Sequence, residues 1–169
     1  MKKYLYLTKK EWVRTWLDGG VIPISLASRF VGDSRRGTQT PDENRIRRSS
    51  VDLTGLSPFI HIRPNSTVVS LNVIGASING VRQPDIINAT QGSEDGLVIC
   101  HANTLNRKIA ERLGKLACVE IQDVASLKTV IDEQLGTDGI MRECQYTDGH
   151  VQDTFLKSRA DEWQDEFRL

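Results

Sequence analysis

The last seven residues hold the side chain best suited to catalysis. From Trp163 onward, apolar and polar residues alternate, which is typical of a β-strand and places Glu166 on the polar face. Asp165 is the exception, because it falls on the apolar face. A carboxylate fixed on a strand can stabilise a developing positive charge, so Glu166 is a candidate catalytic residue. The alternative is an edge strand whose Glu166 and Arg168 side chains are solvated.

Three histidines are the other candidates for acid–base chemistry, namely His61, His101 and His150. Two of them in one cleft could cleave RNA without a metal ion, one as general base and the other as general acid. They lie far apart in the sequence, and a lone histidine is more often structural. We therefore keep a metal-independent ribonuclease as an alternative.

Several functional classes lack their sequence signatures. The chain has no GxxxxGK[ST] or GxGxxG phosphate loop, no HExxH zinc motif and no GxSxG nucleophile elbow. Cys100, Cys118 and Cys144 form no CxxC pair, so we expect neither a metal site nor a disulfide framework. Unpaired cysteines fit the cytoplasm. We expect no membrane helix, because no run of about 18 apolar residues occurs, and the apolar N-terminal stretch is too short for a signal peptide.

Charge is unevenly divided along a chain that is neutral overall. Residues 1–85 carry 13 basic and 7 acidic residues, whereas residues 86–169 carry 9 basic and 15 acidic residues. A polar, arginine-rich stretch at about residues 32–50 adds to the basic half and is long for a passive loop. A basic region favours an anionic ligand such as phosphate or nucleic acid. Mutual attraction of the two halves within one domain explains the pattern equally well.

Local signals predict how the chain begins. Residues 3–7 read as a strand, and Thr8 with Glu11 forms a capping box that starts a helix. The helix ends at Gly19-Gly20, and its apolar face holds Trp12, Val13, Trp16 and Leu17. Residues 21–30 follow as a second strand or extended segment.

The rest of the chain alternates between strand and helix signals. We expect strands at 57–64, 66–74, 97–100, 116–121 and 139–147, with turns at Asn79-Gly80 and Asp148-Gly149. A second helix is capped by Asn103 or Thr104 and closed by Gly114, and a third is capped by Asp123 and closed by Gly136. The prediction is a single α+β domain over residues 1–169, with a mixed or mostly antiparallel split sheet and about three helices.

The order of these elements, together with the ending of the chain, resembles the ADP-ribosyltransferase superfamily. The pattern Phe155-x-Lys157 followed by Trp163-x-x-Glu166-Phe167-Arg168 is similar to endings of bacterial members, and the resemblance covers roughly residues 3–30 and 146–169. In this superfamily NAD lies in a cleft of a split sheet. Its first strand usually presents arginine or histidine, whereas residues 3–7 here offer Lys3 and two tyrosines.

The resemblance implies a role for each of six residues. Glu166 would stabilise the oxocarbenium-like cation formed when the nicotinamide–ribose bond breaks, and would hold the ribose hydroxyls. Arg29 first, and Arg36 second, would pair with the pyrophosphate. The remaining residues would contact the nicotinamide half of NAD: Ser25 or Ser28 its ribose, and Tyr6 its ring.

The predicted function is therefore NAD-dependent ADP-ribosyl transfer by a cytoplasmic effector of toxin or defence type. The acceptor is a protein or a nucleic acid, and the basic stretch mildly favours nucleic acid. A binding module without enzymatic activity, for nucleic acid or a protein partner, is the second alternative beside the ribonuclease.

Overall fold

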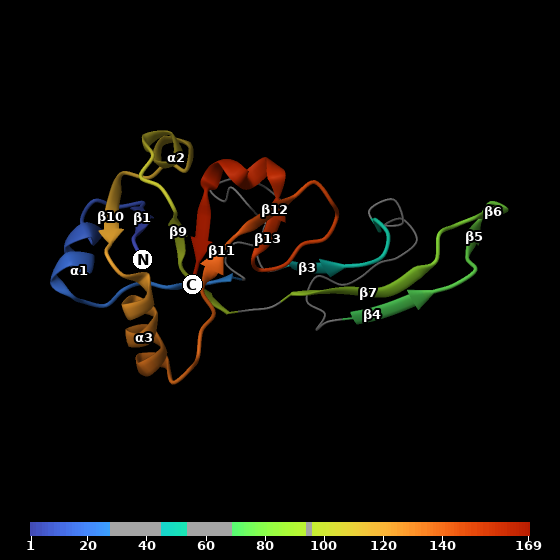
Figure 1. Ribbon diagram of the computed structural model, residues 1–169, viewed down its shortest axis with the longest axis horizontal. Coiled ribbons are helices and arrows are strands. Elements are labelled where there is room, and N and C mark those ends of the chain that lie inside the picture. The colour runs from blue at the N-terminus through green and yellow to red at the C-terminus, as the bar shows by residue number, and fades with distance from the viewer. Residues whose placement is uncertain (28–44, 54–68, 94–95) are drawn as a thin grey trace. The chain divides into compact units, whose positions relative to one another are not determined.

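The computed structural model describes residues 1–27, 45–53, 69–93 and 96–169. Contacts within the chain group into two compact units. Unit 1 comprises residues 1–26, 97–145 and 160–169, and unit 2 comprises residues 27–96 and 146–159. The described strands pair antiparallel and are combined with three α-helices and one 3-10 helix, which confirms the predicted α+β class (Figure 1). The single domain stays a prediction.

Unit 1 is built on a five-stranded sheet in the order β10-β1-β9-β14-β11. These strands are Ala117–Ile121, Lys3–Leu7, Cys100–Ala102, Glu166–Arg168 and Arg142–Glu143, respectively. Figure 1 shows β10, β1 and β9 side by side, although β1 and β10 are separated by more than 100 residues in sequence. A second, two-stranded sheet pairs β2 (Ser25–Leu26) with β8 (Leu97–Val98).

The core of unit 1 lies on one face of this sheet. Strand β1 is predicted correctly, and its alternation buries Lys3, Leu5 and Leu7. Leu5 and Leu7 pack with Ile99 and Val119. Helices α1 (Trp12–Asp18) and α3 (Val124–Leu135) cover the same cluster, because Trp12, Val13, Trp16 and Ile131 pack against it.

Helix α1 ends as predicted but begins later. Gly19 closes it with a φ of 76°, which glycine adopts without strain. The predicted capping box is wrong, because the helix starts at Trp12 and Glu11 at its N-cap makes no side-chain capping bond. Thr8 instead accepts a hydrogen bond from the Lys115 ammonium. Leu17, expected on the buried face, is 69% exposed, since a helix of two turns packs through its other apolar residues.

The two later helices differ in how well their starts were predicted. The Asp123 side chain accepts a hydrogen bond from the Ala125 N–H, and Gly136 closes α3 in the left-handed conformation, both as expected. Helix α2 (Arg107–Arg112) is capped by Asn106, whose side chain accepts from the Lys108 N–H, so the prediction of Asn103 or Thr104 is wrong. Those two residues contact Asp165 instead.

The end of the chain differs most from its prediction. A 3-10 helix, η3 (Arg159–Gln164), occupies the first part of the expected strand, and β14 contains only three residues. Strand β14 is not an edge strand, because it pairs with β9 on one side and β11 on the other. All three of its residues are buried, so the alternative of an edge strand with solvated Glu166 and Arg168 is wrong.

Unit 2 contains a three-stranded sheet and a hairpin (Figure 1). The sheet order is β3 (Arg45–Arg48), β7 (Ile86–Ser93) and β4 (Val69–Val73). Strands β5 (Ser77–Ile78) and β6 (Val81–Arg82) are joined by Asn79 and Gly80, both at positive φ, as the predicted two-residue turn requires. Strand β12 (Gln145–Thr147) pairs with β13 (Leu156–Ser158).

Some predictions fall outside the described residues. These are the strand at 57–64, the first part of the strand at 66–74, and most of the arginine-rich stretch at 32–50. No helix in the described ranges is both long and apolar enough to cross a membrane.

Candidate active site

The centre of the site is an ion pair within strand β14. The Arg168 Nε lies 2.9 Å from Glu166 Oε1, and Nη2 of the same guanidinium lies 3.5 Å from Oε2. Residues i and i+2 of a strand point to the same face, which brings the two side chains together. Glu166 is only 4% exposed and Arg168 1%. Both oxygens of the carboxylate are therefore held by one buried cation.

The strand register fixes what lies beside Glu166. Glu166 pairs with Ala102 of β9, and Ala102 pairs with Tyr4 of β1, so these three residues share one face of the sheet. On the other side, the Cys144 N–H donates to the Glu166 carbonyl at 2.9 Å. In the direction of β1, the first side chain beside Glu166 is thus the methyl group of Ala102, and the next is Tyr4.

Tyr6 lies on the same face as Glu166, because it is two residues after Tyr4. Its hydroxyl accepts a hydrogen bond from the Asn106 N–H at 2.7 Å and lies 3.1 Å from the carbonyl oxygens of Thr104 and Asn106. Burial raises the pKa of this phenol. The hydroxyl is thus anchored to the start of α2, which fixes the position of the ring.

The described residues include only part of the predicted site. Tyr6, Ser25 and Glu166 all belong to unit 1. Ser25 pairs with Val98 in the β2–β8 sheet. Val98 lies two residues before the start of β9. Ser28, Arg29 and Arg36 lie outside the described residues, so the pairing of arginine with pyrophosphate stays a prediction.

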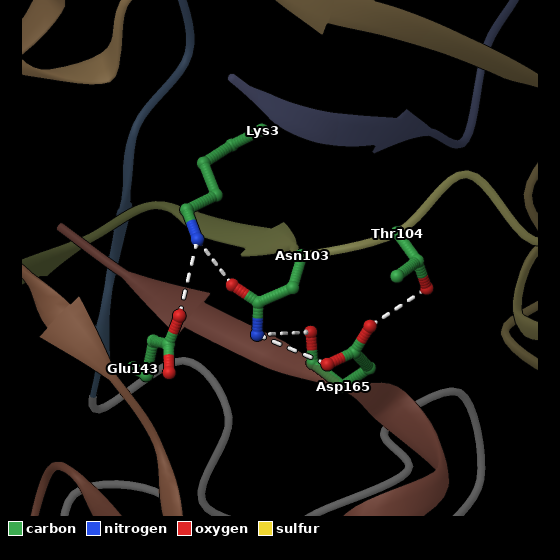
Figure 2. A network of polar contacts seen from close by, with 5 residues as sticks. All are labelled: Lys3, Asn103, Thr104, Glu143 and Asp165. Atoms are coloured by element: carbon green, nitrogen blue, oxygen red, sulfur yellow. Dashed lines mark hydrogen bonds and ion pairs between the residues drawn. The ribbon is translucent and has the colours of Figure 1, made fainter. Parts of the chain in front are cut away.

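The opposite face of the sheet carries a polar network that the sequence did not reveal (Figure 2). The Asn103 amide donates to Asp165 Oδ1 at 3.0 Å, and the Thr104 hydroxyl donates to Asp165 Oδ2 at 2.7 Å. The Lys3 ammonium donates to Asn103 Oδ1 and lies 3.5 Å from Glu143 Oε1. The one signal in the sequence was Asp165, a polar residue on the apolar side of an alternating strand.

Lys3 is unusual in this network because its side chain is 4% exposed. Its ammonium lies 4.3 Å from the centroid of the Phe167 ring, a cation–π contact that compensates part of the cost of burying the charge. Lys3 stands on the first strand and faces the interior of unit 1.

His101 is buried between these elements and is neutral at physiological pH. It is 3% exposed, and neither ring nitrogen has a hydrogen-bonding partner among the described residues. Burial lowers the pKa of His101 to about 4. Its ring meets that of Phe167 edge to face at 6.4 Å.

The other two histidines belong to unit 2. The His150 Nε2 lies 3.0 Å from the Ser49 carbonyl oxygen, within unit 2, and His61 lies outside the described residues. The described residues of unit 1 thus contain a single histidine, in a position closed to solvent. This arrangement gives no specific support to the ribonuclease alternative.

In the described part of the chain, no group of three or more His, Cys, Asp or Glu side chains could hold a metal ion. Cys100, Cys118 and Cys144 are not joined by a disulfide bond. Trp163, the expected aromatic anchor, stacks under the Arg112 guanidinium at 3.8 Å and so holds η3 to α2.

Comparisons with known proteins identified no relative of this chain. No family model, no curated protein and no solved structure matches this chain.

Proposed function

We propose that the protein transfers ADP-ribosyl groups from NAD, with Glu166 as the catalytic carboxylate. The observation that carries the proposal is the buried Glu166–Arg168 pair on β14, a central strand of the unit 1 sheet. A carboxylate whose two oxygens are fixed by a neighbouring cation is oriented before any substrate arrives. Such preorganisation is what electrostatic stabilisation of a transition state requires.

The free-energy cost of burying two charged side chains supports a functional reason for this pair. Removing two charges from water costs several kcal/mol per ion, and a buried pair is often no more stabilising than apolar residues of similar volume. Charged groups kept in such a place are candidates for a functional site.

The proposed reaction is a substitution at C1′ of the nicotinamide-side ribose. The bond from C1′ to the nicotinamide nitrogen breaks, and its electron pair neutralises the pyridinium. A nucleophile of the acceptor then bonds to C1′ and loses its proton. Glu166 would face the positive charge that develops on the ribose between these events.

Other residues take the roles that the resemblance implies. The anchored ring of Tyr6 is proposed to stack on nicotinamide, and Ser25 or Ser28 to hold the ribose. Arg29 and Arg36 are proposed to pair with the pyrophosphate as planar, bidentate donors. This set accounts for the nicotinamide and its ribose, where the reaction takes place, and for the pyrophosphate, which carries the negative charge.

The acceptor is proposed to be a protein or a nucleic acid, in keeping with an effector of toxin or defence type. Overall charge does not favour nucleic acid once the units are considered. Unit 1 contains 12 basic and 13 acidic residues, and unit 2 contains 10 and 9. The local candidates for phosphate contact are Arg47 and Arg48 of β3, of which Arg48 lies 3.5 Å from Asp153.

Release of nicotinamide from NAD tests the proposal directly. Wild-type protein should release nicotinamide, in the presence of cell extract or of water as acceptor, and Glu166→Gln should abolish the release. Glu133→Gln is the matched control, because Glu133 is an exposed glutamate of α3. No release by wild-type protein with every acceptor tried would exclude the activity. Release that survives Glu166→Gln would exclude the role of Glu166.

A further inference from the structure

Asp165, the residue immediately before Glu166, has an uncommon backbone conformation. Its φ is 48°, in the left-handed region, which few residues other than glycine adopt and in which asparagine and aspartate are the commonest exceptions. It stands between η3 and β14, where the chain turns from helix into strand. Residues held in such a conformation cluster at functional sites, where the surroundings compensate for the strain.

Four hydrogen bonds hold Asp165 to the end of β9. Its carbonyl oxygen accepts from the Asn103 N–H at 2.8 Å and from the Asn103 amide Nδ2 at 3.2 Å. Its carboxylate accepts from that same amide at 3.0 Å and from the Thr104 hydroxyl at 2.7 Å (Figure 2). Backbone and side chain of Asp165 are therefore both fixed by two consecutive residues of one segment.

Lys3 determines which way the Asn103 amide points. An amide can be turned so that its oxygen and nitrogen exchange places. The Lys3 ammonium has only donors, so it requires the amide oxygen on its side, which directs the amide nitrogen toward Asp165 (Figure 2). Glu143 at 3.5 Å and the Phe167 ring at 4.3 Å in turn hold Lys3 in place. The network thus runs from the first strand to the residue before Glu166.

We propose that Asp165 is a positioning residue, which sets where the Glu166 carboxylate stands through its bonds to Asn103 and Thr104. This inference rests on the proposed function of Glu166. Asp165 precedes β14, and its side chain is held by Asn103 and Thr104. Its bonds fix the entry of β14, and thereby the placement of Glu166 opposite Ala102.

Two substitutions separate positioning from folding. Asp165→Gly tolerates the left-handed backbone but removes the carboxylate that Asn103 and Thr104 hold. Asp165→Asn also tolerates it and keeps one side-chain oxygen as an acceptor. We expect kcat for nicotinamide release to fall roughly 100-fold in Asp165→Gly, because a small misplacement of a catalytic group can lower the rate by about that factor. KM should change by less than about 2-fold, because substrate binding is not the step affected. Asp165→Asn should recover most of the loss, and Asp18→Asn, an exposed aspartate on α1, should have no effect.

A second readout does not depend on activity. In protein labelled with ¹³C-glutamate, the carboxyl signal of Glu166 is assigned by its loss in Glu166→Gln. This signal should move in Asp165→Gly and stay in place in Asp18→Asn. Wild-type protein without nicotinamide release would overturn the proposed function alone, and the signal would then still decide the positioning role. An unmoved signal, or an unchanged kcat in Asp165→Gly, would overturn the inference.

Discussion

The guanidinium of Arg168 spans both carboxylate oxygens of Glu166, two residues away on the same strand, at 2.9 and 3.5 Å. Leaving one buried charge without the other is costly, so we expect the loss of one member of the pair to destabilise the protein more than the loss of both. This coupling distinguishes the site from an exposed ion pair, which contributes little to stability.

Removing the cation alone should therefore destabilise the protein strongly. Arg168→Met removes the guanidinium that contacts both oxygens of the buried Glu166 carboxylate, and we expect the free energy of unfolding to fall by about 3–5 kcal/mol. The double substitution Glu166→Gln with Arg168→Met should recover much of this loss. Urea denaturation followed by circular dichroism measures both variants. Equal effects of the single and double substitutions would mean that the pair is not energetically coupled.

The buried His101 predicts a dependence of stability on pH. The pKa of His101 is about 4 in the folded protein and near 6.5 when unfolded, so only the unfolded chain binds this proton between those values. Stability should then fall as pH decreases from 6.5 to 4, by about 2 kcal/mol at pH 5. His101→Leu should flatten this part of the curve, whereas His150→Gln should not. A wild-type curve without this slope would contradict the assignment of His101 as a neutral, buried ring.

The β5–β6 turn predicts a local effect of glycine replacement. Gly80 has a φ of 79°, so Gly80→Ala should cost about 1 kcal/mol in the stability of the hairpin. The amide of Gln83, which donates to the Ala76 carbonyl at 2.8 Å, should exchange its hydrogen faster. Gly96→Ala is the control, because an added Cβ there meets nothing within 4 Å and its φ is not in the left-handed region. Equal exchange at Gln83 in both variants would argue against a left-handed Gly80.

A nucleic-acid acceptor requires an interaction that weakens with salt. If Arg47 and Arg48 of β3 bind phosphate, the double substitution to glutamine should lower the slope of log K against log salt by about 1 for each phosphate group that is no longer bound. Fluorescence polarisation of a labelled single-stranded oligonucleotide measures this slope. Arg14→Gln, an exposed arginine on α1, serves as the control. An affinity that does not respond to salt would favour a protein acceptor.

Local signals predicted those elements whose ends depend on neighbouring residues. Asp123 and Gly136 delimit α3, and Asn79-Gly80 forms the turn between β5 and β6. Caps and turns depend on hydrogen bonds and φ angles of neighbouring residues, which a local sequence pattern encodes. The same local pattern predicts Asn103 or Thr104 as the cap of α2, and this prediction is wrong. Asp165, distant in sequence, competes for both side chains, and Asn106 takes the capping role.

The candidate site was predicted by residue type but not by environment. Alternation around Glu166 correctly indicated a strand, yet burial depends on which strands lie on either side. The neighbours of β14 are β9 and β11, and no local pattern encodes that order. The role of Lys3 in the polar network could not be predicted either. Its hydrogen bond to Asn103 joins two segments that are far apart in sequence.

The pairing of Leu26 with Leu97 has a consequence for how this chain could be divided. Both residues belong to unit 1, and the Ala27 N–H continues the ladder by donating to the Gly96 carbonyl at 2.8 Å. Residues 27–96 thus leave unit 1 and return to it at adjoining positions. One antiparallel strand pair therefore holds the two ends of this 70-residue segment together.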